Sequence, residues 1–391
     1  MIKTGKPTAY QALWQKTQRR LSHYLNVLAC CLALTPLSLH ADSLEDGIEK
    51  PTGIYSSSIS HGEALANEHA LGALIRVKWN ELEPSPGEFN WALIENQIDN
   101  MDDFSHDKRW SLAIIAGKES PEWLYDEGDY FVVNSMLGDI SIPKFWDPQV
   151  QLRLQDLALA LAAEYGDDPR LSLVYLPQMT SNGVEGHFNG VATSTLEAAG
   201  LSPDKWIAAV TTAASSFALA LPSKAIAVEV HTLLNDSSIA ETIINQLWDD
   251  PALEQRVGAA MWWLSGKESY QTELLAVLRE YPGDLYAQVI GRSDQSDRFL
   301  NGDYATVFAQ AKELGVRYIE PWERELTYHT HDLLMADFNQ WSYDTFEAGS
   351  NGDESVEEDS PLDTESGEQR SRSRQHTWRQ RRNPMHSARP L

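Results

Sequence analysis

The sequence contains almost no cysteine. Its 391 residues include two, Cys30 and Cys31, which are adjacent and lie near the N-terminus. If an N-terminal leader is removed after Ala41, as argued below, the remaining chain has none. Disulfide bonds and thiolate catalysis are then excluded, so stability must come from a hydrophobic core. Apolar residues make up 42% of the chain, which is enough for a sizeable core.

Positive charge is scarce in the middle of the chain. Residues 42–346 hold 48 acidic residues against 19 basic ones. A body this negative repels nucleic-acid phosphates and anionic lipids, so neither is predicted as a partner. The charge is compatible with a solvated acidic surface or with a neutral substrate.

The sequence also lacks a long hydrophobic run. Its most apolar stretch, Leu25–Leu39, is too short to span a bilayer comfortably, and Pro36 interrupts it. Basic residues precede this stretch, and the small Ala41 follows it, which is the pattern of a secretory signal peptide over residues 1–41. We therefore predict an exported protein, periplasmic or extracellular, without stable membrane insertion. A lipoprotein acylated at Cys30 is the alternative.

The C-terminal segment 347–391 differs from the rest in composition. Nine acidic residues without a base are followed by seven arginines without an acid, and apolar residues are few. Such a segment cannot bury enough surface to offset the entropy of ordering, so we predict a disordered tail. Its arginines would bind an anionic partner or its own acidic half, or the tail is an extension without a function.

Between these ends, the domain at residues 42–346 alternates short apolar runs with longer amphipathic stretches. Helix start signals, such as Asp147 before Pro148, and stop signals, such as Gly315, bound several of the amphipathic stretches. Parallel strands need crossover connections, so the alternation favours a single (β/α)8 TIM barrel of the α/β class. An open doubly wound sheet is the alternative, although no Gly-rich phosphate turn follows the first strand. The eight predicted strands are 53–59, 73–79, 110–117, 171–178, 225–232, 257–264, 285–290 and 316–320.

In a TIM barrel the functional residues follow the C-terminal ends of the strands. Glu185 follows the fourth predicted strand, between Gly183 and Gly186, where we expect a flexible backbone; His187 stands nearby to tune its carboxyl. The alternative is a glutamate of a surface loop. We take Glu185 as the first candidate catalytic acid.

Two further glutamates are candidate catalytic residues. Glu229 alternates with valines at the end of the fifth predicted strand, so it shares one strand face with His231. Glu320 ends the eighth predicted strand. A structural role for Glu320, paired with Arg76, is the alternative.

Three stretches carry a resemblance to a known family. The pattern R-x-x-W-x-x-x-E-P-x-P-G-x-F-x-W spans Arg76–Trp91, and Ser120–Leu124 and Pro143–Arg170 follow it in order. Together they resemble clan A TIM-barrel glycoside hydrolases, most closely family 42 and family 5-like enzymes, over roughly residues 50–190. The resemblance implies a glycoside substrate, an acid/base carboxyl after strand 4 and a nucleophile after strand 7.

The sequence departs from the clan pattern at both catalytic positions. Val184 stands before Glu185 where the clan has asparagine, and the seventh predicted strand contains no glutamate. The second carboxylate would then be Glu320 or Glu229. Alternatively, the barrel binds saccharide without cleaving it, or it is an unrelated barrel hydrolase or lyase.

The predicted substrate is a β-linked oligo- or polysaccharide, cleaved by carboxylate acid/base chemistry without a cofactor. Thirteen tryptophans provide stacking surfaces for sugar rings, although for any single one core packing is the better explanation. The sequence does not indicate an oligomeric state. The predicted substrate-binding residues are Arg76, Trp79, Glu119, Trp123, Gln178, Asn182, His187, His231, Trp262 and Trp322.

No metal site is predicted. His329 and His331, followed by Asp332, place two imidazoles at i and i+2. Neither a cysteine nor a third histidine lies near them in the sequence, so the ligand set that zinc requires is incomplete.

Overall fold

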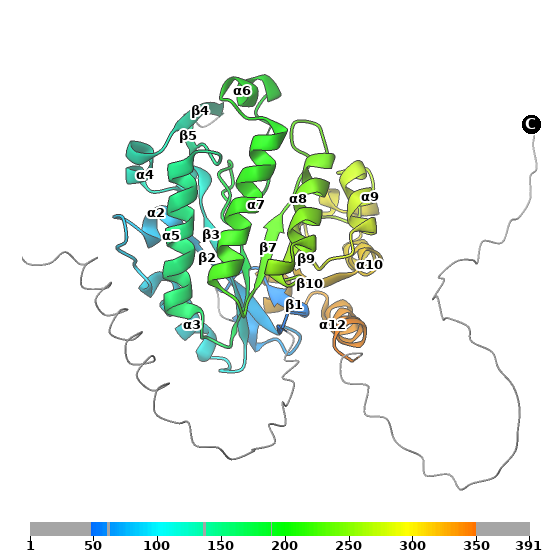
Figure 1. Ribbon diagram of the computed structural model, residues 1–391. Coiled ribbons are helices and arrows are strands. Elements are labelled where there is room, and N and C mark those ends of the chain that lie inside the picture. The colour runs from blue at the N-terminus through cyan, green and yellow to red at the C-terminus, as the bar shows by residue number, and fades with distance from the viewer. Residues whose placement is uncertain (1–47, 61–62, 136–137, 189, 349–391) are drawn as a thin grey trace, which may run out of the picture. The chain divides into compact units, whose positions relative to one another are not determined.

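The computed structural model describes residues 48–60, 63–135, 138–188 and 190–348 (Figure 1). The predicted signal peptide, and the predicted tail from residue 349 onward, lie outside the described residues. The described chain forms two compact units. The first comprises residues 48–51, 77–90 and 109–258, and the second comprises residues 52–76, 91–108 and 259–348.

Eight strands form a closed barrel in the order β1-β10-β9-β8-β7-β6-β3-β2. The pairings between barrel strands within each unit are parallel. The predicted eight-stranded α/β barrel is therefore confirmed, and the open doubly wound sheet is excluded. The barrel strands are β1 (Gly53–Ser56), β2 (Gly72–Lys78), β3 (Arg109–Ile115), β6 (Leu171–Tyr175), β7 (Ala225–Glu229), β8 (Val257–Leu264), β9 (Leu285–Val289) and β10 (Val316–Glu320).

Helices lie between the strands, and their starts follow from local chemistry. Asp147 caps α5, where its Oδ1 accepts from the backbone N–H of Gln149 at 2.8 Å, and Pro148 occupies the first helical position. Gly315 ends α10 with a φ of 78°, a left-handed conformation that glycine adopts without strain. The α-helices are α2 (Trp79–Leu82), α3 (Ala92–Asp102), α4 (Glu122–Glu127), α5 (Pro148–Tyr165), α6 (Thr193–Ala198), α7 (Pro203–Ala220), α8 (Ser238–Asp249), α9 (Thr272–Glu280), α10 (Ala305–Leu314), α11 (Glu323–Thr327) and α12 (Asp332–Phe346).

The first unit contains β3, β6 and β7, covered by α5, α7 and α8, which run side by side in Figure 1. Every residue of β6 and β7 is buried, because these strands lie between the barrel interior and the helices. The unit also holds an antiparallel hairpin, β4 (Tyr130–Ser135) and β5 (Gly138–Pro143), which the sequence analysis did not predict.

The second unit contains β1, β9, β10 and most of β2 and β8, together with α9, α10 and α12. All residues of β9 and β10 are buried. Helix α12 holds the start of β1, since Asn339 Oδ1 accepts from the Ile54 N–H at 2.8 Å and Ser342 Oγ accepts from the Gly53 N–H at 3.1 Å. Within the described ranges, every helix is too short or too polar to span a bilayer.

Candidate functional site

The loop that follows β6 is folded tightly against the end of β3. Gly183 has a φ of 79°, and a Cβ there would lie 2.5 Å from the Ala116 carbonyl oxygen, so only glycine fits. The Gly183 carbonyl accepts from the N–H groups of Gln178 at 2.8 Å and Ala116 at 3.2 Å. Thr180 Oγ1 donates to the Glu185 carbonyl at 2.7 Å. These bonds fix the backbone that carries Glu185, so the glycine serves close packing, not the flexibility that the sequence indicated.

The same loop is tied to the end of β7. The Gly186 N–H donates to Glu229 Oε2 at 2.6 Å, and a Cβ on Gly186 would lie 2.9 Å from the Glu229 carbonyl oxygen. Gln178, buried to 1% exposure, donates from Nε2 to the carbonyls of Val184 at 2.7 Å and Glu229 at 2.8 Å. Gln178 was predicted to bind substrate. In the structure its amide joins the loop to the neighbouring strand.

Glu185 is held as an anion. Its Oε1 accepts from Asn182 Nδ2 at 2.8 Å, and its Oε2 lies 3.0 Å from His187 Nε2. Burial alone would raise the pKa of Glu185, but it is outweighed by the His187 hydrogen bond, by the charges of His187 and His231, and by the Asn182 hydrogen bond. The pKa of this carboxyl is consequently lowered from its ordinary 4.5. A carboxylate in this state is suited to acting as a base, a nucleophile or a metal ligand.

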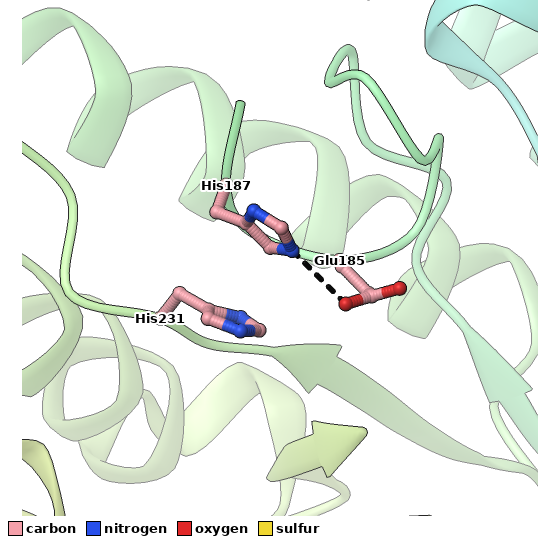
Figure 2. A group of neighbouring side chains, drawn as sticks. All are labelled: Glu185, His187 and His231. Atoms are coloured by element: carbon pink, nitrogen blue, oxygen red, sulfur yellow. Dashed lines mark hydrogen bonds and ion pairs between the residues drawn. The ribbon is translucent and has the colours of Figure 1, made fainter. Parts of the chain in front are cut away.

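His231 adds a second imidazole to Glu185 and His187. The two rings lie 4.1 Å apart between centroids, and one ligand atom from each of the three residues lies within 4.8 Å of the others. Figure 2 shows Glu185 and His187 on one loop, with His231 facing them from the segment after β7. We call these three residues the Glu-His-His cluster.

Glu229 orients His231. Its Oε2 lies 3.0 Å from His231 Nδ1, and both side chains are nearly completely buried. The sequence predicted that these two residues share one face of a strand. In the structure β7 ends at Glu229 and His231 follows the strand, but the two side chains are in contact. A carboxylate on Nδ1 fixes the orientation of an imidazole and directs the other ring nitrogen, Nε2, to do chemistry.

Three other residues of the first unit that were predicted to bind substrate lie in or near α2 and α4. Trp79 is fully buried, and its Nε1 donates to Glu83 Oε2 at 2.8 Å, whereas Trp123 donates from Nε1 to the Glu83 carbonyl at 3.0 Å. The two indoles pack edge to face at 6.2 Å. Trp79 therefore belongs to the core. Glu119 is partly exposed and lies 3.7 Å from Lys78 Nζ.

In the second unit, Glu320 is fully buried at the end of β10. Its Oε2 accepts from Gln288 Nε2 at 2.6 Å, and its Oε1 accepts from the Tyr318 hydroxyl. Gln288 stands opposite Glu320 on β9, the seventh barrel strand. The strand from which the resemblance implies a carboxylate nucleophile thus presents an amide.

Trp322 lines a cavity of about 630 Å³ in the same unit. Its side chain is 39% exposed, and its Nε1 donates to the Val289 carbonyl at 2.9 Å. Glu323, which accepts from Ser58 Oγ at 2.8 Å, lines the cavity as well. The volume is in the range of small-ligand sites. Trp262 is 9% exposed, and the Arg76 guanidinium lies 4.8 Å from its ring centroid.

The histidine pair that the sequence analysis weighed as metal ligands is arranged differently. His329 Nδ1 lies 2.8 Å from Asp332 Oδ2, whereas the His331 ring stacks on Tyr304 with 4.6 Å between centroids. Among the described residues, three potential ligands come together only in the Glu-His-His cluster. The sequence indicated all three members as candidate site residues. It did not indicate that they form one cluster, because His231 lies 44 positions after His187 in the chain.

Comparisons with known proteins found similar chains among solved structures. No protein-family model matches it, and no curated protein matches it in sequence. Endo-glycoceramidase II from Rhodococcus sp. is similar with 12% identity and a TM-score of 0.44, over 71% of this chain and 74% of that one. Xylanase 10B from Thermotoga maritima has 13% identity and a TM-score of 0.43, over 69% and 82%. Xylanase XynB from Paenibacillus barcinonensis has 14% identity and a TM-score of 0.44, over 69% and 83%.

Proposed function

We propose that the protein is an exported glycoside hydrolase that cleaves a β-linked oligo- or polysaccharide, with Glu185 as its ionised catalytic carboxylate. The observation that carries this proposal is the Glu-His-His cluster at the C-terminal ends of β6 and β7, the end of a TIM barrel where catalysis takes place. The resemblance of Arg76–Trp91 to the clan A signature supports a saccharide as the substrate.

The chemistry of the cluster gives each residue a role. Glu185, an anion, attacks the anomeric carbon, and protonated His231 gives its proton to the leaving glycosidic oxygen. The glycosyl ester on Glu185 is then hydrolysed by a water whose proton returns to His231. Glu229 keeps the imidazole in place through Nδ1.

The separation of the groups fits this division of roles. In retaining glycosidases the two carboxyl groups lie about 5–5.5 Å apart, whereas inverting enzymes need ~6.5–9.5 Å to admit a water; we apply the same criterion to a carboxylate and an imidazole. The ligand atoms of Glu185 and His231 lie within 4.8 Å of each other. We therefore propose retention of the anomeric configuration. This changes the role of Glu185 from the proton donor that the sequence favoured, because His187, His231 and Asn182 all stabilise its charged form.

Saccharide binding without cleavage is the second candidate function. It is favoured by β9, where Gln288 donates to Glu320 and no carboxylate stands on the seventh barrel strand. In that case the cluster would bind sugar hydroxyls through its carboxylate and imidazoles.

The experiment compares Glu185→Gln with Glu197→Gln, the same change at an exposed position of α6. Both are assayed against a panel of polysaccharides and aryl β-glycosides, and binding is measured in parallel. We expect Glu185→Gln to lose at least about a hundredfold in kcat/KM while its circular dichroism is unchanged, and Glu197→Gln to match the parent. Full activity of Glu185→Gln would overturn the proposal. Binding by the parent without any turnover would establish the second candidate function.

A further inference from the structure

We propose that the Glu-His-His cluster is also a binding site for one divalent transition-metal ion, for which Zn²⁺ is the natural probe. The donors are a Glu185 carboxylate oxygen and one nitrogen each from His187 and His231. Two imidazoles and one carboxylate are the protein ligand set of an open zinc site, in which a water or substrate oxygen takes the fourth position.

The present distances are close to those of a coordinated ion. Bond lengths of about 2.0–2.2 Å place two ligand atoms of a tetrahedral zinc site roughly 3.3 Å apart. Glu185 Oε2 and His187 Nε2 are 3.0 Å apart. The His231 donor lies within 4.8 Å of both, so a shift of at most about 1.5 Å completes the set.

The surroundings of the three donors favour a metal ion as well. Glu229 Oε2 faces His231 Nδ1, which directs Nε2 toward the ion. Asn182 holds the second oxygen of Glu185. The side chains of Glu185 and His187 are each 23% exposed, so ions and water reach the cluster from solvent.

Charge gives a further reason. The carboxylates of Glu185, one of the three donors, and of Glu229, which lies 3.0 Å from His231 Nδ1, balance the charge of a divalent cation. The same lone pairs serve metal binding and proton transfer, so an occupied cluster cannot carry out the acid–base chemistry proposed above.

This inference does not rest on the proposed function, because binding is measured without saccharide. The full-length chain, untagged and treated with chelator, is titrated with ZnCl₂ by calorimetry and by competition with a chromophoric chelator. A Cys30→Ser/Cys31→Ser background removes thiolate binding near the N-terminus. We expect one Zn²⁺ per chain.

Four variants test the donors. Glu185→Gln, His187→Gln and His231→Gln should each weaken zinc binding by more than about tenfold, and Glu229→Gln by about 10–100-fold through the orientation of His231. His329→Gln is the matched control, because His329 lies beside Asp332 outside the cluster. The zinc affinity of this variant should equal that of the parent. Circular dichroism monitors the fold of each variant.

Two results would overturn the metal site: no zinc bound by the folded parent, or equal affinity in the cluster variants and the parent. Neither result bears on hydrolysis, which the Glu185→Gln assay decides. If zinc binds and stimulates cleavage, the metal site stands and the metal-free roles of Glu185 and His231 are wrong. If zinc binds and inhibits, both proposals are supported.

Discussion

At the scale of single residues, Glu185 is defined by its neighbours more than by its place in the sequence. A glutamate between two glycines predicts a mobile acid in a loop. The structure instead fixes the backbone through Thr180 and Gly183, and it stabilises the anion through Asn182 and His187. The lowered pKa of Glu185 favours the role of nucleophile over that of proton donor.

The lowered pKa of Glu185 predicts how activity depends on pH. The carboxyl is ionised down to below its ordinary value of 4.5, so the acid limb of kcat/KM should lie below pH 4.5. The lowered pKa of Glu185 also affects the stability of the fold. It contributes to the free energy of unfolding above the unfolded-state pKa, and this contribution is lost as the pH falls through the folded-state pKa. A pH–rate profile measures the limb. An acid limb well above pH 4.5 that disappears in Glu185→Gln would contradict the assignment.

Removing the proton donor, His231, should lower kcat more than disturbing its orientation does. We expect His231→Gln to lower kcat by about 10²–10⁴-fold, the usual contribution of a general acid. Glu229→Gln should lower kcat less, because the imidazole remains and only its positioning weakens. Steady-state kinetics on metal-free protein check this order, with the exposed His106→Gln as control. A larger loss in Glu229→Gln would show that Glu229, and not His231, reacts with the substrate.

At the scale of elements, local signals located most of the barrel. Asp147 with Pro148 predicted the start of α5, and Gly315 predicted the end of α10, because caps and glycines act within one helical turn. The hairpin β4–β5 escaped prediction. Its strands, Tyr130–Ser135 and Gly138–Pro143, lie between the third and fourth predicted barrel strands, where no further strand was predicted.

Asp147 offers a test of helix capping. Asp147→Ala removes the acceptor for Gln149 N–H and should lower the free energy of unfolding by about 1 kcal/mol. Glu164→Ala, an exposed change near the end of the same helix, should stay within about 0.5 kcal/mol of the parent. Urea unfolding followed by circular dichroism measures both. Equal stabilities would show that the cap does not stabilise α5.

The loop after β6 is the element on which the cluster depends. Gly183→Ala introduces both a left-handed alanine and a Cβ 2.5 Å from the Ala116 carbonyl, so the loop must shift. Gly190→Ala shares the positive φ of 77° but meets open space, so it should cost only the roughly 1–2 kcal/mol of backbone strain. We expect Gly183→Ala to cost more stability and to lose both hydrolysis and zinc affinity. Equal stability, hydrolysis and zinc affinity in the two variants would show that close packing of Gly183 against Ala116 does not position the cluster.

At the scale of the whole molecule, the strand–helix alternation was sufficient to predict a closed parallel barrel, since few folds accommodate eight such repeats. The partners of individual side chains were beyond the sequence. That Gln178 binds backbone carbonyls, and that Trp79 is buried against Trp123, depends on long-range packing that no local pattern encodes.

Export is a prediction for the entire chain. If residues 1–41 are a signal peptide, N-terminal sequencing of the protein from the periplasm or medium should begin at Asp42. A lipid-modified N-terminus at Cys30, detected by mass spectrometry, would establish the lipoprotein alternative. An intact Met1 in the cytoplasmic fraction would contradict export.

The central claim is that ionised Glu185 attacks the anomeric carbon. The most direct measurement uses a 2-deoxy-2-fluoro glycoside with a good leaving group, made from the sugar that the substrate panel identifies. The fluorine slows both formation and release of the glycosyl-enzyme, and the good leaving group restores formation alone, so the intermediate accumulates. After digestion, peptide mass mapping locates the label. We expect one glycosyl group on Glu185 in the parent and none in Glu185→Gln. A label on Glu229 or Glu320, in a protein that turns over the parent sugar, would contradict the central claim.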